Sequence, residues 1–435
     1  MAKKAVPKAE THKESPKGAE SKGHPQESSS QPQVNIGLVG HVDHGKTTLV
    51  KALSGKWTDT HSEELKRGIT IKLGYADAIF HKCPKCPEPD CFSLKPTCPK
   101  CGGTSPVHRV VSFVDAPGHE SLMATMLAGA TILDGALLLI SASEECPQPQ
   151  TREHLKALEI VGIQKVIVIQ NKVDAVSEEQ ATKNYNEIKD FLKSSLYENA
   201  PIVPISAMHG INIDALIGTI EEVIPTPMRD PKAEPLFFVA RSFDINRPGS
   251  DPLTLKGGVL GGAVKQGTFA IGETIQLVPG YEVEERNKKV WKPITTTIKG
   301  LMTGGTAVDR IQPGGSCAIM TELDPAIVKA DALIGAVVGH PGKLPPVHST
   351  IKLKAVLLER MVGSKEELKI DPVRKAEVLM LNVNSAATVG VVSDVSKNIA
   401  TIPLKRPICA YPGSRVTISR RVENRFRLIG YGILQ

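Results

Sequence analysis

Short apolar runs alternate with amphipathic stretches over residues 34–228. The runs predict strands at 34–39, 71–80, 109–114, 136–141, 166–170 and 202–205. Helical periodicity predicts helices at 151–161 and 177–194, and an apolar face over 213–224 that stops at Pro225 predicts a third. This alternation favours a largely parallel sheet covered on both faces, so we expect an α/β domain.

The later part of the chain has a different pattern, with short strands of alternating polarity, for example over 350–356. Glycine pairs such as Gly257-Gly258 fit the turns and bulges of small barrels. A Pro-containing break at 342–346 divides this region into two halves. The pattern therefore predicts two all-β barrel domains, at 229–345 and 346–435.

The two ends of the chain are basic. Residues 1–33 carry six lysines against four glutamates and no aromatic side chain, a composition that predicts a disordered basic tail. Residues 401–435 hold seven basic residues and one acidic residue, a net charge of +6 out of +7 for the whole chain. An acidic partner such as RNA and a solvated strand face both fit that charge.

Composition limits the class of protein. The 435 residues contain no apolar run long enough to span a bilayer and no secretory signal at the start. The eight cysteines are then expected to be reduced thiols or metal ligands rather than disulfides. We expect a cytosolic protein that does not contact a membrane.

The spacing G-x-x-x-x-G-K-T at 40–47 predicts a phosphate-binding loop. It follows the strand predicted at 34–39 and opens a helical segment, so main-chain N–H groups and a helix N-terminus point at one spot. Lys46 would reach the β- and γ-phosphates of a nucleotide, and the Thr47 hydroxyl would bind Mg²⁺.

Three further elements follow at predicted strand ends, in the order that a guanine-nucleotide site requires. Asp115-Ala116-Pro117-Gly118 can hold a Mg²⁺ water through Asp115 and sense a γ-phosphate through the Gly118 N–H. In Asn171-Lys172-Val173-Asp174, the Asp174 carboxylate can accept two N–H donors of guanine, which adenine cannot offer. The third element, whose main chain can donate to the guanine O6, is Ser206-Ala207-Met208.

Thr70 lies between the phosphate loop and Asp115, in the segment 66–71. Its hydroxyl can bind Mg²⁺ and touch a γ-phosphate only when a triphosphate is present. We therefore expect this loop to be an order–disorder switch.

Two cysteine pairs give an independent signal. Cys83 and Cys86 are followed, after eleven intervening residues, by Cys98 and Cys101, which is the spacing of a structural Cys₄ zinc site. A zinc knuckle at 81–104 would lie in a hairpin between two predicted strands near the switch. Disulfide pairs are the other interpretation, and Cys91 is a fifth thiol in the loop.

These residues resemble the translational GTPases, and among them the gamma-subunit family of translation initiation factor 2, of the archaeal type. The resemblance covers about 34–435 and rests on the strings GHVDHGKTT at 40–48, KRGITIKLGY at 66–75, DAPGHE at 115–120, PQPQTREH at 147–154 and LKGGVLGG at 255–262, together with the paired cysteines.

The resemblance implies a G domain followed by two barrels, and low intrinsic GTP hydrolysis. It implies a GTP-dependent carrier of initiator methionyl-tRNA to the small ribosomal subunit, assembled with an alpha and a beta subunit. It also adds residues to the GTP, GDP and Mg²⁺ site, namely Asp43, His44, Gly45, Thr48 and Gly68, with Asp43 at an extra Mg²⁺. His119 matches the position that orients the hydrolytic water in this class.

Two other functions stay open at this point. The chain could be a scaffold that binds GTP, tRNA and two subunits while hydrolysis is incidental. It could also be an elongation-type carrier of another aminoacyl-tRNA, such as the selenocysteine factor. The predicted knuckle and the short C-terminus argue against the second of these.

Overall fold

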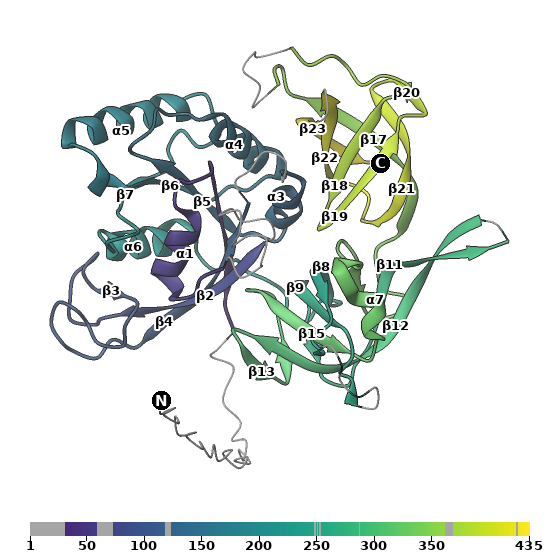
Figure 1. The fold of residues 1–435 in the computed structure, drawn as a ribbon, viewed down its shortest axis with the longest axis horizontal. Helices are drawn as coiled ribbons and strands as arrows, with labels where there is room; N and C mark the ends of the chain where they lie inside the picture. The colour runs from purple at the N-terminus through teal and green to yellow at the C-terminus, as the bar shows by residue number, and fades with distance from the viewer. Residues whose placement is uncertain are drawn as a thin grey trace, which may run out of the picture.

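The computed structural model describes residues 31–58, 73–117, 123–247, 249, 251, 254–286, 288–361, 369–422 and 425–435. These residues form an α/β domain followed by two β-barrels, which confirms the predicted fold class (Figure 1). The first thirty residues of the predicted tail lie outside the described part of the chain. Among the described residues, no helix is both long and apolar enough to cross a membrane.

The first domain alternates strands and helices as the apolar pattern predicts. Its elements are β1 (Val34–Gly40), α1 (Lys46–Ser54), β2 (Gly74–Lys82), β3 (Phe92–Ser93), β4 (Val107–Asp115), α3 (Met123–Ala130), β5 (Gly135–Ser141), α4 (Pro149–Val161), β6 (Val166–Asn171), the 3₁₀ turn η2 (Val173–Ala175), α5 (Glu178–Leu192), β7 (Ile202–Pro204) and α6 (Ile213–Val223). Ser177 caps α5 by accepting the Gln180 N–H at 3.3 Å, as its position before the helix predicts.

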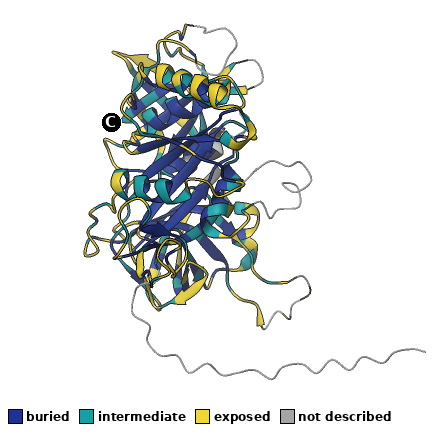
Figure 2. Cartoon of the chain, turned by 90° about the vertical axis from the view of Figure 1, so that its left-hand side faces the viewer, coloured by how far each residue is buried: buried dark blue, intermediate teal, exposed yellow. Residues whose placement is uncertain are grey.

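The seven strands of this domain lie in the order β3-β2-β4-β1-β5-β6-β7. All pairs from β4 to β7 are parallel, whereas β2 and β3 join the edge in antiparallel fashion. Alternate residues of β5 face opposite layers: Leu137 packs with α1 and α6, and Leu138 packs with α3, α4 and α5. The sheet is therefore the buried centre of the domain (Figure 2).

The first barrel contains β8 (Leu236–Phe243), β9 (Val259–Gln266), β10 (Phe269–Ala270), β11 (Thr274–Glu285), β12 (Lys288–Thr303), β13 (Thr306–Val308), β14 (Arg310–Ile311), β15 (Cys317–Thr321), α7 (Pro325–Val328), the 3₁₀ turn η4 (Lys329–Asp331) and β16 (Val337–Gly339). Six strands run in the order β11-β16-β8-β9-β15-β12, and the pairing of β11 with β12 closes the ring. Closure removes the sheet edges and surrounds an apolar core.

The second barrel contains β17 (Val347–Leu357), β18 (Val378–Val383), β19 (Ala386–Val391), β20 (Asp394–Ser396), β21 (Ile399–Cys409), β22 (Arg415–Val422) and β23 (Arg425–Leu434). Its ring is β17-β23-β22-β18-β19-β21, closed by the pairing of β17 with β21. In β17, Ile351 and Leu353 point into the core while Lys352 and Lys354 are exposed, as the alternating sequence predicts.

Ion pairs and main-chain contacts join the three domains. Arg229 leads into the first barrel and bonds Asp134 of the α/β domain at 2.5 Å. Arg427 of the second barrel bonds Glu153 of α4 at 2.6 Å. Gln31 belongs to the predicted tail, yet its side-chain amide donates to the Gly314 carbonyl of the first barrel at 3.0 Å. The chain is thus anchored to a barrel immediately before it enters β1.

Candidate nucleotide site and cysteine cluster

The phosphate loop connects β1 to α1 through left-handed backbone at Asp43 (φ 60°) and Gly45 (φ 92°). A side chain at Gly45 would lie 2.3 Å from the amide nitrogen of Asn171, so only glycine fits this position. Among the described residues, no side-chain hydrogen bond caps the N-terminus of α1 at Gly45. A helix N-terminus of this kind directs main-chain N–H groups and a positive dipole end toward the loop, as a phosphate site requires.

Lys46 folds back over the loop that precedes it. Its side chain is buried, and the ammonium donates to the carbonyls of Gly40 at 3.0 Å and His41 at 2.6 Å. A buried ammonium needs such partners to offset its desolvation. The lysine charge is thus held at the loop, at the place where a phosphate would compensate it.

Asp115 ends β4 next to the first turn of α1 and is fully buried. One of its carboxylate oxygens accepts the hydroxyls of Thr47 and Thr58, each at 2.7 Å. The predicted neighbours Thr47 and Asp115 are therefore in contact, although they are far apart in the sequence. Two hydroxyls on a buried carboxylate form an all-oxygen donor set of the kind that Mg²⁺ prefers.

Asn171 connects the phosphate loop with the other end of the candidate site. Its amide donates to the His44 carbonyl at 2.9 Å, and its side-chain oxygen accepts the Ala207 N–H at 3.0 Å. A hydrogen bond from Ser206 lowers the pKa of the Asp174 carboxyl, which keeps this group ionised. The second and third predicted elements therefore lie side by side.

Histidines surround the inner side of the loop. The His44 ring is fully buried, with Nδ1 3.0 Å from the Leu139 carbonyl and Nε2 3.4 Å from Glu144, so any contact with a nucleotide runs through its main chain. Nδ1 of His154 accepts the Gly40 N–H at 2.8 Å. Burial lowers the pKa of His44 and lowers that of His154 to about 3, so both rings are neutral at pH 7.

The remaining predicted residues are in different situations. Thr48 is half-buried in the first turn of α1, Lys172 has left-handed backbone at φ 63°, and the side chains of Asp43 and Met208 are exposed. Four predicted residues lie outside the described part of the chain: Gly68, Thr70, Gly118 and His119.

Cys83, Cys86, Cys98 and Cys101 gather at the end of the β2–β4 hairpin. Their sulfur atoms all lie within 4.8 Å of one another, and two pairs, Cys83–Cys101 and Cys86–Cys98, are 3.6 Å apart. Tetrahedral zinc with Zn–S bonds of about 2.3 Å separates its ligands by about 3.8 Å. The spacing therefore fits one zinc ion and is too long for disulfides, whose S–S bond is about 2.05 Å.

The surrounding main chain also suits a metal. N–H groups of Lys85 and Cys86 lower the pKa of Cys83 to about 6, which favours the thiolate form that binds a metal. Cys91 is buried outside the four-sulfur group. The knuckle (81–104) packs on α6, where the Phe92 ring lies against Gly218.

A cavity of 460 Å³ lies between the α/β domain and the first barrel. Tyr75 and Asp77 line it from β2, and Arg241, Phe243 and Met302 line it from the barrel. Burial raises the pKa of the Asp77 carboxyl. The cavity is thus a groove formed by two domains, and its shape depends on how they are docked.

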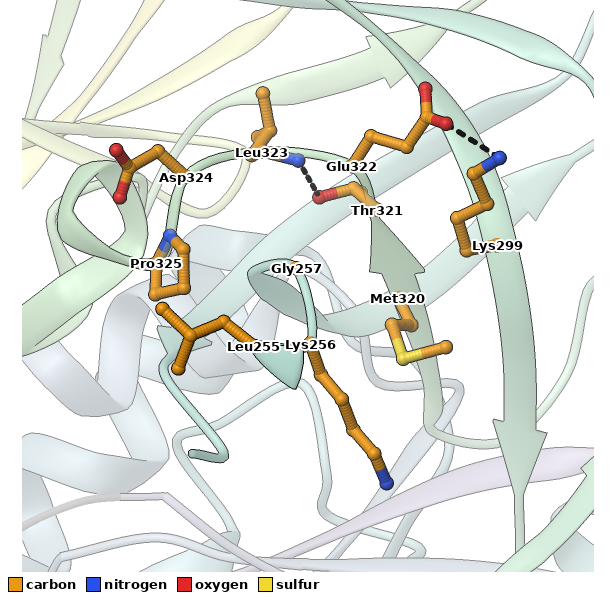
Figure 3. A pocket seen from close by; sticks show the side chains of 10 residues that line it. All are labelled: Leu255, Lys256, Gly257, Lys299, Met320, Thr321, Glu322, Leu323, Asp324 and Pro325. Carbon is orange, nitrogen blue, oxygen red and sulfur yellow. Dashed lines mark hydrogen bonds and ion pairs between the residues drawn. The ribbon is translucent and has the colours of Figure 1, made fainter. Parts of the chain in front are cut away.

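A second cavity, of 440 Å³, lies within the first barrel (Figure 3). The start of the LKGGVLGG string lines it, opposite the Lys299–Glu322 ion pair. A side chain at Gly257 would lie 1.8 Å from the Thr321 carbonyl oxygen. This glycine is therefore explained by close backbone approach, and none of the predicted site residues lines the cavity.

Sequence reasoning assigned no role to His154, although it lies within the string PQPQTREH. A polar residue on the buried face of α4, between Thr151 and Leu158, was the available signal. Its partner Gly40 lies 114 residues earlier, so periodicity could not identify the contact.

Two family descriptions match the chain. Residues 31–226 match the Elongation factor Tu GTP binding domain, and residues 349–434 match Initiation factor eIF2 gamma, C terminal.

Several full-length relatives are more than half identical. Translation initiation factor 2 subunit gamma of Methanocaldococcus jannaschii is 58% identical over 93% of this chain and 98% of that protein. Proteins of the same name from Methanothermobacter thermautotrophicus and Pyrococcus horikoshii are each 54% identical over 93% of this chain, and the matches cover 100% and 98% of their lengths.

Solved structures of more distant proteins share the fold. A bacterial selenocysteine-specific elongation factor, EF-Sec, aligns with a TM-score of 0.69 at 24% identity, over 93% of this chain and 58% of the other. SelB from Methanococcus maripaludis, in complex with the GTP analogue GppNHp, aligns with a TM-score of 0.67 at 22% identity, over 93% and 79%. At these identities the likeness concerns the fold alone.

Proposed function

The chain belongs to the translation initiation factor 2 subunit gamma family, and from this premise we propose that it carries initiator methionyl-tRNA to the small ribosomal subunit in a GTP-dependent manner. It is a translational GTPase that acts in initiation. In our proposal it works as the gamma subunit of a heterotrimer with alpha and beta subunits, and hydrolyses GTP on delivery. We propose domain limits of 34–228, 229–345 and 346–435.

In the proposed nucleotide site, phosphates lie over the N-terminus of α1 and beside Lys46. Thr47 would bind Mg²⁺ and Asp115 would hold a water of that ion, whose charge would offset that of the phosphates. Asp174, ionised and next to Ser206, would accept the two N–H donors of guanine. Thr70, Gly118 and His119 would complete the site around the γ-phosphate, with Gly68 and Asp43 as further Mg²⁺ ligands.

The observation that carries the tRNA proposal is the groove between the α/β domain and the first barrel. Its β2 wall begins at Gly74, a few residues after the predicted switch containing Thr70. A γ-phosphate that orders the switch would therefore also shape this wall of the groove. The aminoacyl end of the tRNA would bind there, and GTP and tRNA affinities would be coupled through one element.

The scaffold alternative makes a different prediction for hydrolysis. If His119 orients the attacking water, His119→Ala should slow single-turnover GTP hydrolysis on the ribosome by about a hundredfold while leaving GTP affinity intact. An unchanged rate, with and without ribosomes, would favour the scaffold. The selenocysteine-carrier alternative has only the shared fold in its favour, whereas the relatives that are 54–58% identical are initiation factor subunits.

Base recognition is tested separately by Asp174→Asn. The amide offers one donor in place of an acceptor, so guanine binding should weaken by about a hundredfold while xanthine nucleotide gains affinity. Binding of fluorescent GDP and XDP to the full chain measures both changes. Retained guanine preference would contradict the assignment of Asp174.

The decisive test of the function compares two tRNAs. We expect initiator methionyl-tRNA to bind the chain, together with alpha and beta subunits, more tightly in GTP than in GDP. Elongator methionyl-tRNA, which carries the same amino acid, should bind more weakly in both states. Equal binding of the two tRNAs, or binding that ignores the nucleotide, would contradict the proposal.

A further inference from the structure

Helix α4 contacts the phosphate loop through His154 and the second barrel through the adjacent Glu153. The fully buried ring of His154 accepts the Gly40 N–H at 2.8 Å through Nδ1. A nitrogen that accepts a hydrogen bond carries no proton, so the ring is neutral and its proton lies on Nε2.

Gly40 is a conformationally free residue at the start of the phosphate loop. It is the last residue of β1, has φ of 142°, and its carbonyl accepts the Lys46 ammonium at 3.0 Å. A side chain here would lie 2.4 Å from the Leu139 carbonyl oxygen, so only glycine fits. Because glycine is conformationally free, an acceptor for its N–H restrains this peptide, and His154 supplies one.

The histidine lowers the stability of the fold at this position. Its Nε2 is buried and has no hydrogen-bond partner among the described residues. An unpaired buried N–H is destabilising, and an apolar side chain at this position of α4 would avoid that penalty. Unlike an apolar side chain, the imidazole can accept the Gly40 N–H through Nδ1.

The adjacent residue faces the second barrel. The Glu153 carboxylate is buried and accepts Nη1 of Arg427 in β23 at 2.6 Å. At the other end of the same helix, Nη1 of Arg415 donates to the Ile160 carbonyl at 2.7 Å. Of these two contacts between the barrel and α4, the one made by Arg427 is next to His154 and the one made by Arg415 is not.

We propose that His154 is a positioning residue of the nucleotide site, and that the Glu153–Arg427 ion pair couples docking of the second barrel to nucleotide affinity. His154 fixes the peptide of Gly40, Gly40 holds Lys46, and a shift of α4 moves all three together. The inference rests on the assignment of residues 40–47 as the phosphate site.

The first test measures release of fluorescent GDP from the full chain by stopped flow, together with thermal stability. His154→Leu should speed release by about tenfold, since Gly40 loses its acceptor. His154→Asn, whose side-chain oxygen can take the place of Nδ1, should restore most of the wild-type rate. A change in melting temperature with unchanged GDP release for His154→Leu would overturn the positioning role.

Lys46→Ala tests the site itself, because normal GDP binding by this variant would refute the phosphate-loop assignment instead.

The second test is a double-mutant cycle across the domain interface. Arg427→Met should speed GDP release about threefold in the wild-type background and have no further effect on His154→Leu. Arg415→Met is the matched control, because it removes a contact between the same barrel and helix at the far end. It should leave GDP release unchanged in both backgrounds. Independent, multiplicative effects of Arg427→Met and His154→Leu would overturn the coupling.

Discussion

The phosphate loop and the cysteine knuckle (81–104) are both turns at the ends of strands in one sheet, yet they are held in different ways. The phosphate loop is fixed by side chains from other parts of the domain: Asn171 bonds the His44 carbonyl, and His154 bonds the Gly40 N–H. The knuckle is mostly exposed, and its strand β3 has two residues. Its four thiols gather within 4.8 Å of one another, and only Cys83 and Cys98 among them are buried, in the apolar cluster that also contains Phe92.

The difference separates two ways of building a site. A loop that is braced by its domain is already shaped for its ligand, so ligand binding costs little ordering. A peripheral loop with few core contacts needs its ligand for stability, because metal binding and folding are then the same event.

Removal of a bound metal should cause the largest loss of local stability, and this loss should be confined to the knuckle. Structural zinc contributes about 10 kcal/mol of apparent binding free energy in small metal-dependent folds, so chelation should abolish hydrogen-exchange protection over 81–104. Protection in β1, β5 and β6 should persist, because those strands have their own buried layers. Cys86→Ser should reproduce the loss and Cys146→Ser should not. Loss of protection throughout the sheet would show that the knuckle is not peripheral.

Asn171→Ala should have the next largest effect, on the loop that the domain braces. The substitution removes two buried hydrogen bonds and leaves the Ala207 N–H unpaired, so we expect a loss of about 2–3 kcal/mol in the free energy of unfolding. GDP affinity should fall as well, since the phosphate loop at His44 and the segment at Ala207 would no longer be joined through Asn171. The control Asn246→Ala lies in the first barrel and should leave GDP affinity unchanged; an equal loss there would contradict the bracing role.

The pH dependence of the free energy of unfolding should also reflect the buried His154 ring that accepts the Gly40 N–H. Burial lowers the pKa of His154 to about 3, below its value of about 6.5 in an unfolded chain, and Lys46, His41 and His44 lie nearby and act in the same direction. Between these values the unfolded state binds a proton that the folded state does not. Stability should therefore fall as pH drops below about 6.5, with His154 contributing about 1.4 kcal/mol per pH unit.

His154→Leu should lack that part of the slope when denaturant unfolding is compared at pH 6 and pH 4.5. Equal slopes in the two proteins would show that the ring takes up a proton in the folded state. The other acid-sensitive groups are common to both proteins, so the difference isolates this histidine.

Gln31→Ala should have the smallest effect. Its amide bonds to the Gly314 carbonyl and its oxygen accepts the Gln312 N–H at 3.2 Å, and these contacts are partly solvent-exposed. Loss of about 0.5–1 kcal/mol is expected from denaturant unfolding. Deletion of residues 1–30 retains Gln31 and is the matched control. A larger loss on deleting 1–30 than on Gln31→Ala would show that the anchor lies elsewhere.

Local pattern was sufficient for much of the α/β domain. Strands 34–39, 136–141 and 166–170 agree with β1, β5 and β6 because continuous apolar runs mark strands that are buried on both faces. The four-sulfur group agrees with the pair spacing because each Cys-x-x-Cys turn fixes two ligands locally. The motif at 171–174 predicted contact of Asp174 with a guanine base, but the hydrogen bond from Asn171 to the His44 carbonyl bridges 127 residues and has no periodic signal.

Residue types at short spacings were enough to indicate the order of domains, the phosphate-loop motif, the paired cysteines and the family. Only the tertiary structure shows that the Gly40 N–H donates to His154, that Arg427 donates to Glu153, and that Gln31 bonds to the first barrel. Such contacts join residues 114 to 283 positions apart, and only the packing of sheet, helix and barrels brings them together. The braces of the site are therefore properties of the fold, whereas its chemical groups are properties of the sequence.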